Sequence, residues 1–443
     1  MQFNEPTFLF LFLPVVLALY YSVPPGRNVV LFVATLLFLA WAGQQTVFVL
    51  LGAMVFNYVA GLFVARRRWW LVAGITANVV LLAWCKYAAF LNLPLPHLPA
   101  PPGLSFFTFV AIAYLVDVYR GDAPAITHPL HAGNYFVFFS RAWAGPIVRY
   151  RDLGSQLAAR PVNRELFAAG ARRFIVGLGK KVLIANTVGG PADRIFALPA
   201  NELTAPVAWL GIVCYTIQIY FDFSGYTDMA IGVGAMFGFR FPENFNYPYT
   251  ATSIRDFWRR WHMTLSGWLR DYLYIPLGGS RCAPGRVYFN LVFVFLICGL
   301  WHGAAWTFVV WGLLQGCFLL LERATGHKEL PRPWGHLYVL AVTGISWVFF
   351  RAATVPAAVH DLGVMCGINQ ATAVSDGVRA YATPPVLLAL LAGIIGSMPV
   401  VPTLKTRHAI HPAWELAALT VILLAAIVFL AASTYAPFIY QQF

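Results

Sequence analysis

Long apolar blocks constrain the fold of this chain more than any other feature of its sequence. Apolar runs such as 46–65 and 412–433 occur along the whole chain, and short polar or basic stretches separate them. About 20 consecutive apolar residues are needed for a helix to cross the hydrocarbon core of a bilayer. Only 11% of the residues are charged, whereas a water-soluble domain carries about a quarter. Too few polar groups remain to coat a water-facing surface, so the sequence predicts an all-α integral membrane protein.

The apolar blocks place the candidate spans near 7–23, 28–43, 46–65, 69–93, 103–119, 167–190, 206–223, 225–240, 289–302, 304–321, 336–350, 385–401 and 412–433. Several of these blocks are short or polar, so we expect about 11 transmembrane helices, with re-entrant or interfacial helices between them. No internal repeat or soluble domain interrupts the pattern. We therefore treat residues 1–443 as a single polytopic membrane domain.

Basic residues outnumber acidic ones by 30 to 17, which gives a formal net charge of +13. In a soluble protein this charge would suggest a nucleic-acid partner. Here the basic residues lie in short loops between apolar blocks, for example Arg66–Arg68 and Lys405, and such loops usually face the cytoplasm. We therefore expect contact with membrane lipid, no nucleic-acid partner, and an N-terminus on the outer side of the membrane.

Several common catalytic signatures are absent from the sequence. The six cysteines are scattered and form no CxxC pair, which gives no basis for a zinc site or a disulfide framework. No HExxH helix, Walker A loop or GxSxG elbow occurs. We therefore expect no bound metal and no bound cofactor, and nucleotide hydrolysis and redox chemistry find no support.

One histidine interrupts an otherwise apolar run. His302 is the only His, Asp, Glu, Lys or Arg between Phe289 and Leu321. As one helix this run would be about 50 Å long, well beyond a bilayer core, so we predict a hairpin that breaks near Gly299–Ala304 with His302 at its bend. An ionisable group in such surroundings is functional by default, and low polarity favours the neutral imidazole that a general base needs. The alternative is a structural histidine that is hydrogen-bonded between helices.

A second histidine lies in a basic and aromatic segment, residues 255–270. Drawn as one helix, the segment places a polar set on one face and an apolar set on another; these are Arg255, Arg259, His262 and Ser266 against Phe257, Trp261, Leu265 and Trp268. We expect this helix at the cytoplasmic interface, where it either serves as a plain membrane anchor or presents its arginines to an anionic donor such as a coenzyme A phosphate. In the second case His262 lies where that donor enters.

Two carboxylates fall within the apolar stretch 218–228. Asp222 and Asp228 each need a hydrogen-bond or cationic partner in such surroundings. We favour a structural role, in which they pair with arginines, over a role in orienting a histidine.

Three long segments together resemble a known family. They are YFDFSGYTDMAIGVGAMFGFRFPENFNYPY at 220–249, ATSIRDFWRRWHMTLSGWLRDYLYIPLGG at 251–279 and GLWHGAAWTFVVWG at 299–312, with support from AGPIVRYRDL at 144–153 and GLSFFTFVAIAYLVDVYRG at 103–121. The chain resembles the membrane-bound O-acyltransferase (MBOAT) family, and within it the bacterial branch of alginate O-acetyltransferases and their cellulose-acetylating relatives. The resemblance defines a core at about 100–351, with peripheral helices at 1–99 and 352–443.

The resemblance implies helices around a membrane-spanning tunnel, with His302 in the place of the catalytic histidine of the family and His262 in the place of a second, less strictly required one. The family moves an acyl group from an intracellular thioester toward an acceptor outside, often through partner proteins. One departure lies at Ser140 and Arg141, where relatives usually carry Pro and then His or Gln. This departure points to an altered local shape or an altered choice of acceptor.

The leading hypothesis that follows is acetyl transfer in the bacterial inner membrane. Acetyl-CoA is the expected donor, and hydroxyls of an exported polysaccharide such as alginate or cellulose are the expected acceptors, reached directly or through a periplasmic partner. We assign His302 as general base, His262 as support on the donor side, and Trp301 and Trp306 as tunnel walls. Two alternatives stay open: D-alanyl transfer from a carrier protein to teichoic acid on the same fold, and a transporter or flippase.

Overall fold

The computed structural model describes residues 1–96, 98, 100–326, 330–368, 371, 376–407, 411–432 and 438, and in these ranges every regular element is helical. The all-α fold class is thus confirmed for this part of the chain. The described chain divides into two compact units. The first unit comprises Met1–Gly177 and Tyr226–Glu243, and the second comprises Leu178–Gly225 and Asn244–Phe443.

The N-terminal helices form most of the first unit. In chain order they are η1 (a π-helical turn, Phe8–Phe12), α1 (Leu13–Ser22), η2 (a 3₁₀ turn, Pro24–Gly26), α2 (Arg27–Ala40), α3 (Gln44–Val64), α4 (Arg68–Tyr87), α5 (Leu104–Arg120), α6 (Pro129–Phe136), α7 (Tyr150–Ala158) and α8 (Arg164–Gly179), whose last residues pass into the second unit.

The second unit follows along the chain. Its elements are η3 (a π-helical turn, Lys180–Ala185), α9 (Asn186–Phe196), α10 (Ala205–Met236, whose C-terminal part belongs to the first unit), η4 (a 3₁₀ turn, Pro248–Thr250), α11 (Ile254–Arg260), α12 (Met263–Leu269), η5 (a π-helical turn, Arg270–Tyr274), α13 (Pro284–His302), α14 (Trp306–Ala324), α15 (Arg332–Arg351), α16 (Val355–Met365), α17 (Val378–Tyr381), α18 (Pro384–Gly396), α19 (Val400–Arg407) and α20 (Pro412–Ala432).

Membrane-spanning helices are abundant in the described residues. Seven are long and apolar enough to cross a bilayer, namely α3, α4, α10, α13, α14, α15 and α20. Two helix pairs, bent by 118° within Phe8–Ala40 and by 58° within Pro384–Arg407, bring the number to nine if each pair counts as one span. The chain is therefore a multi-pass membrane protein, whereas the expected number of about 11 spans is not confirmed.

One reason for the lower number is α10. We expected two spans, 206–223 and 225–240, but the structure has one continuous helix of 32 residues. Ser224 and Gly225 interrupt the apolar pattern, yet both keep the backbone N–H that the hydrogen-bond ladder of a helix requires, and glycine is common in membrane helices. At 1.5 Å per residue α10 is about 48 Å long, so it extends beyond a single bilayer core.

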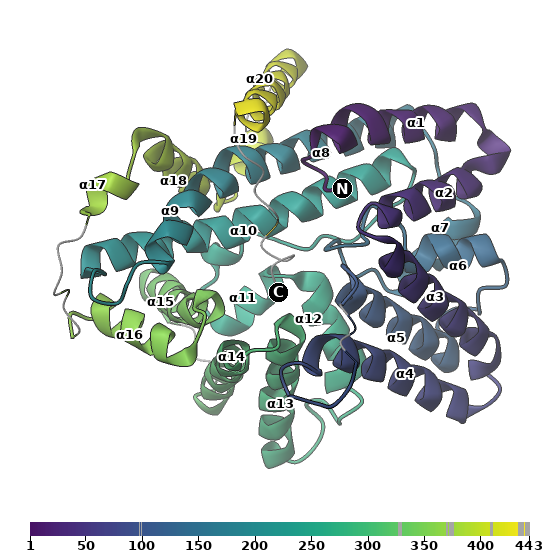
Figure 1. The fold of residues 1–443 in the computed structure, drawn as a ribbon, viewed down its shortest axis with the longest axis horizontal. Helices are drawn as coiled ribbons and strands as arrows, with labels where there is room; N and C mark the ends of the chain where they lie inside the picture. Colours follow the sequence, from purple (N-terminus) through teal and green to yellow (C-terminus); the bar gives the residue numbers. More distant parts are fainter. Residues whose placement is uncertain are drawn as a thin grey trace. The chain divides into compact units, whose positions relative to one another are not determined.

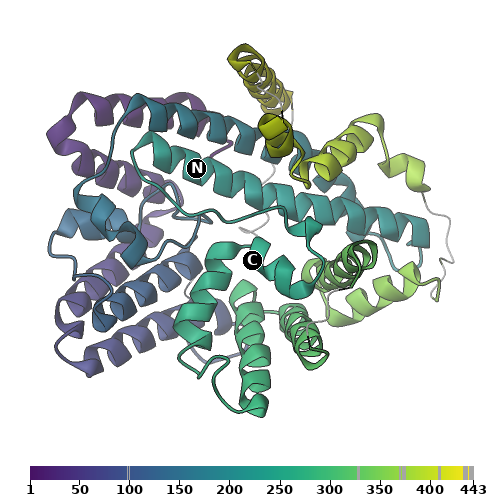
Figure 2. The ribbon, with the colours of Figure 1, turned by 180° about the vertical axis from the view of Figure 1, so that it is seen from behind.

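In the first unit, α3, α4 and α5 lie side by side (Figures 1 and 2). Asn57 of α3 and Asn78 of α4 are buried and exchange amide hydrogen bonds of 2.8 and 3.1 Å, which satisfies both polar groups inside an apolar layer. Gly103, just before α5, has a φ of +81°, and a Cβ atom there would lie 2.0 Å from the carbonyl oxygen of Ala142. The loop 137–149 therefore packs directly against the start of α5.

In the second unit, α13 and α14 form an antiparallel pair that is visible from both sides (Figures 1 and 2). The pair is close because two glycines face each other: a Cβ atom at Gly299 would lie 2.3 Å from the carbonyl oxygen of Phe308, and one at Gly312 would lie 2.4 Å from that of Phe295. Small residues let helix backbones approach in this way inside a membrane. The expected helical hairpin is thus present.

A chain of polar side chains ties α11 to this hairpin and to α15. The indole N–H of Trp258 donates to Gln315 Oε1 at 2.9 Å, and Gln315 Nε2 donates to Ser346 Oγ at 2.8 Å. The Ser346 hydroxyl in turn donates to the carbonyl of Val342 at 2.7 Å. Because each buried donor has an acceptor, this network holds three helices in one arrangement.

Candidate active site

His302 lies where the sequence places it, at the turn of the α13–α14 hairpin. It is the last residue of α13, and α14 begins at Trp306. With 19 residues α13 is about 28 Å long, close to the thickness of a bilayer core. His302 is therefore nearly a full crossing away from the start of α13, where Arg281 and Arg286 lie.

Aromatic rings surround the His302 imidazole. Its centroid lies 4.7 Å from the ring of Trp301, 5.0 Å from that of Trp311 and 5.2 Å from that of Phe350. The Trp311 and Phe350 rings meet the imidazole edge to face. Only 5% of the histidine is exposed. The imidazole therefore lies against an apolar wall of aromatic rings.

His262 occupies a break between two short helices. We expected one helix through residues 255–270, and this is wrong: α11 ends at Arg260, α12 begins at Met263, and His262 between them has a φ of +42°. Such a backbone conformation is uncommon for a residue other than glycine and persists only where the surrounding structure holds it. Strain at a buried histidine points to a specific use of that side chain.

The amide of Asn244 fixes the tautomer of His262. Asn244 Oδ1 accepts the backbone N–H of Thr264 at 3.2 Å and its hydroxyl at 2.8 Å, and it lies 3.0 Å from His262 Nδ1. Since a backbone N–H can only donate, the atom it contacts is the amide oxygen, and His262 Nδ1 must carry the hydrogen that this oxygen accepts. The lone pair of the neutral ring is then on Nε2.

Burial keeps His262 in that neutral form. The side chain is 0% exposed, and burial lowers its pKa from the ordinary 6.5 to about 3. The Phe223 ring meets the imidazole edge to face at 4.7 Å. His262 is thus a neutral, oriented ring with its basic nitrogen fixed by the Asn244 hydrogen bond.

Trp301 brings the two histidines into one site. Its ring lies 4.7 Å from that of His302 and 6.2 Å from that of His262. Sequence reasoning placed His262 near the inner face and His302 deeper along a path, whereas the structure places both rings against one indole. The membrane-spanning tunnel past these residues stays a prediction.

The two predicted arginines line a separate groove of the same unit. Arg255 and Arg259 are exposed on α11 and border a cavity of about 500 Å³ together with Asp256, Glu322 and Tyr338. Both carboxylates already have partners, because Asp256 bonds Arg260 at 2.9 Å and Glu322 accepts the N–H groups at the start of α11. The exposed guanidinium groups are therefore available to an anionic ligand.

Ser266 does not join those arginines. Its hydroxyl donates to the carbonyl of Trp261 at 3.4 Å, within the turn that the broken helix creates. The apolar set predicted for the same segment is buried as expected; it comprises Phe257, Trp261, Leu265 and Trp268.

The two aspartates are in ion pairs. Asp222 pairs with Lys181, and both side chains are only 2% exposed. Asp228, in the first unit, bonds Arg173 at 2.8 Å, and Arg173 also bonds Glu243. The preferred structural role predicted an arginine partner, which Asp228 has, whereas Asp222 has a lysine.

Trp306 differs from the other predicted aromatic wall. Trp301 is buried, but 66% of Trp306 is exposed at the start of α14.

Sequence reasoning missed Asn244, Trp311 and Phe350 as neighbours of the histidines. Trp311 follows His302 by nine residues in the hairpin, so its proximity could have been inferred from the turn, whereas Asn244 and Phe350 arrive through tertiary packing alone.

Comparison with known proteins gives one family. Residues 75–328 match the family model of MBOAT, the membrane-bound O-acyltransferase family. The chain is 44% identical over 380 residues to a Pseudomonas aeruginosa protein named probable alginate O-acetylase AlgI, a match that covers 80% of this chain and 72% of that protein.

Two further relatives carry other names. A Helicobacter pylori peptidoglycan O-acetyltransferase is 38% identical over 422 residues, which cover 83% of this chain and 80% of that protein. A Bacillus subtilis teichoic acid D-alanyltransferase is 29% identical over 317 residues, which cover 66% of this chain and 78% of that protein.

Proposed function

Since the chain belongs to the membrane-bound O-acyltransferase family and is an acyltransferase, we propose that it transfers an acetyl group from acetyl-CoA to hydroxyls of an exported polysaccharide. The observation that carries this proposal is the pair of buried histidines, His262 and His302, on either side of Trp301. Because the chain is an acyltransferase, the alternative of a transporter or flippase has no support.

His302 acts as the general base in this proposal. It takes the proton of the acceptor hydroxyl while the hydroxyl oxygen attacks the thioester carbonyl, and the C–S bond then breaks. The coenzyme A thiolate leaves and takes up a proton, so the products are the acetyl ester and free coenzyme A. A positioned base of this kind accelerates the step by about 10²–10⁴-fold. A thioester is already activated, so no metal is required by the chemistry.

His262 supports the donor side. Its Nδ1 hydrogen is held by Asn244, and its fixed neutral ring lies against the indole that His302 also contacts. The buried Trp301 forms the wall shared by both rings, and the exposed Trp306 lies at the turn of the hairpin. The exposed Arg255 and Arg259 offer planar donors that suit the phosphates of coenzyme A.

The acceptor is proposed from the relatives. The names of the Pseudomonas aeruginosa and Helicobacter pylori proteins refer to O-acetylation of alginate and of peptidoglycan, both of which are polysaccharides. We further propose that the protein lies in the bacterial inner membrane with its N-terminus outside and works with periplasmic or exported polysaccharide-acetylation partners. D-alanyl transfer is the second candidate, and the lower identity to the teichoic acid enzyme makes it the weaker one.

The test uses the purified full-length chain in lipid nanodiscs with acetyl-labelled acetyl-CoA. The proposal expects thioester cleavage and label transfer to an oligosaccharide acceptor, with both lost in His302→Ala. Wild-type protein that leaves acetyl-CoA intact but consumes a D-alanyl carrier-protein thioester would replace acetyl transfer by the second candidate. Undiminished acetyl transfer by a folded His302→Ala variant would remove the assigned base.

A further inference from the structure

Three consecutive arginines stand at the start of α4 in the first unit, namely Arg66, Arg67 and Arg68. All three are exposed, and among the described residues no ion pair or side-chain hydrogen bond engages any of them. The first turn of α4 contains no acidic residue. The positive charge at this end of the helix is therefore not neutralised by the part of the chain that the structure describes.

An exposed apolar face of α4 continues from these arginines. Its side chains form a shallow hollow of about 750 Å³ that is open along one side. Arg68 and Trp69 lie at one end of the hollow and Val80 at the other, with the small residues Ala73 and Ala77 between them. From Arg68 to Val80 the helix rises about 18 Å, which is comparable with one leaflet, half of a hydrocarbon core of about 30 Å.

The hollow lies on the side of α4 that faces away from its neighbouring helices. A Cβ atom at Gly74 would lie 2.4 Å from Leu115 of α5, and Asn78 bonds Asn57 of α3. Because successive helical residues are turned by about 100°, the residues that line the hollow lie on the opposite face. Val72 on this face is 56% exposed. Since α4 is long and apolar enough to span a bilayer, the hollow faces lipid chains.

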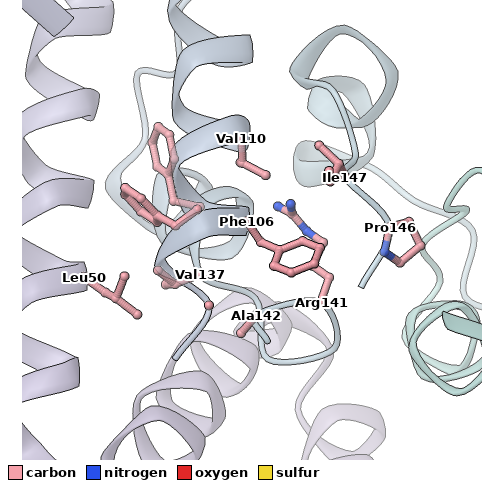
Figure 3. Close-up of a pocket in the computed structure, with 11 residues that line it drawn as sticks. Leu50, Phe106, Val110, Val137, Arg141, Ala142, Pro146 and Ile147 are labelled. Carbon is pink, nitrogen blue, oxygen red and sulfur yellow. The ribbon is translucent and has the colours of Figure 1, made fainter. Parts of the chain in front are cut away.

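Another cation of the first unit shows why an open hollow matters. Figure 3 shows the guanidinium of Arg141 between Phe106, Val110 and Ile147. The space beside it is only about 10 Å³, which is room for one water molecule. The hollow on α4 is open at its side, so a long ligand can enter it from the membrane.

We propose that Arg66–Arg68 and the hollow on α4 form a binding site for an anionic phospholipid. The arginines hold the phosphate, for which guanidinium groups supply paired N–H donors, and one acyl chain lies in the hollow. Clusters of basic residues beside a membrane helix attract anionic lipids in this way. This inference does not depend on the proposed acetyl transfer.

A lipid fits these observations better than a soluble phosphate does. The apolar hollow begins directly below the charged end, and a ligand without chains would leave it unused. Trp69 stacks on Trp70 at 4.1 Å, and tryptophans of membrane helices gather at the level of the lipid headgroups. The charge and the apolar surface therefore follow the order of a phospholipid, with its phosphate at the interface and its chains deeper.

Native mass spectrometry of the full-length protein in detergent measures the apparent Kd of the first bound lipid. The probes are phosphatidylglycerol and phosphatidylcholine with identical acyl chains, so that the two lipids differ only in their headgroup. Each arginine near a membrane surface contributes about fivefold to the affinity for an anionic lipid, so the wild type should prefer phosphatidylglycerol by about tenfold or more. The triple variant Arg66→Gln/Arg67→Gln/Arg68→Gln should lose this preference.

The matched control is Arg281→Gln/Arg286→Gln/Arg332→Gln. It removes the same charge from three exposed arginines that lie at or just before the starts of α13 and α15. The control should keep the preference for phosphatidylglycerol. Thermal unfolding of both triple variants checks that they are folded. Glycerol 3-phosphate, which carries a phosphate but no chains, should not displace phosphatidylglycerol from the wild type.

Loss of the preference in the Arg66–Arg68 variant alone supports the site. Equal preference in that variant and the wild type, an equal loss in the control variant, or no preference in the wild type would overturn it. Displacement by glycerol 3-phosphate as effective as that by phosphatidylglycerol would replace the lipid by a soluble phosphate. A wild-type dimer that binds no lipid would assign this face to a second copy of the chain instead.

Discussion

The α13–α14 hairpin and the broken α11–α12 segment both bring a histidine against Trp301, but they hold it differently. His302 ends a long helix and contacts aromatic rings of two neighbouring helices, Trp311 of α14 and Phe350 of α15. His262 sits at a left-handed backbone position between two seven-residue helices, and a hydrogen bond to Asn244 orients its ring. The first arrangement leaves the imidazole in an apolar wall, and the second fixes one tautomer.

This difference suggests that the two histidines have different roles, one as a base and the other as a supporting group. The contacts of His302 with the Trp311 and Phe350 rings do not require the proton to be on a particular nitrogen, which suits a base that must accept and release a proton. A group that orients or supports benefits from a fixed hydrogen bond, such as that of His262. The proposed roles of the two residues follow from this contrast.

The largest expected effect is on the hairpin histidine. His302→Ala should lower kcat/KM for acetyl transfer by about 10²–10⁴-fold, because the general base is removed. Steady-state kinetics with labelled acetyl-CoA measures the change, and an unaltered thermal unfolding curve controls for folding. Equal losses of kcat/KM in His302→Ala and in a His262 variant would contradict the different roles proposed for the two histidines.

The histidine at the break should matter less. We expect His262→Asn to lower kcat/KM by about tenfold, since a supporting group contributes less than the base. Asparagine is the suitable replacement because it tolerates a positive φ. The same kinetic assay measures it, and a loss larger than that of His302→Ala would exchange the two roles.

The close approach of α13 and α14 should be sensitive to a single methyl group. Gly299→Ala is expected to lower the free energy of unfolding by about 1–3 kcal/mol, because the added Cβ meets the Phe308 carbonyl. Gly285→Ala on the same helix is the control, since a Cβ there meets nothing within 4 Å. Chemical unfolding in mixed micelles compares the two, and equal stability would contradict the tight hairpin.

Acid should act on the broken segment through His262. Its pKa is about 3 in the folded protein and about 6.5 when unfolded, so between these values only the unfolded state binds the proton. The contribution of His262 to the free energy of unfolding is fully present above about pH 6.5. It falls by about 1.4 kcal/mol per pH unit as the pH drops toward 3. His262→Asn should remove this contribution. Unfolding free energies measured between pH 4.5 and 6.5 check it, and an identical dependence on pH in both proteins would refute it.

The smallest expected effect is on the exposed face of α11. Arg259→Gln should raise KM for acetyl-CoA about threefold and leave kcat unchanged, since an exposed ion pair contributes about 0.2–1 kcal/mol. Arg281→Gln, an exposed arginine outside the groove, is the control. A fall in kcat with unchanged KM would place Arg259 away from donor binding.

Structural features that depend on the length of the apolar runs and the spacing of apolar residues could be predicted. The hairpin around His302 followed from a run too long for one bilayer crossing, with a break expected near Gly299–Ala304, and α13 and α14 confirm it. The single helix through 255–270 was wrong, although its apolar residues were correctly assigned to the core. Helical periodicity describes both one long helix and two short ones, because short helices keep the same spacing within each piece.

The sequence alone determined that the chain crosses a membrane as helices, that His302 lies in an apolar hairpin, and which family the chain resembles. These depend on composition, block length and motifs, which are local properties of the chain. Only the tertiary structure decided that Trp301 joins both histidines, that Asn244 sets the tautomer of His262, and that Arg141 lies buried beside Tyr135. Such contacts join residues far apart in the chain, and packing rather than local propensity fixes them.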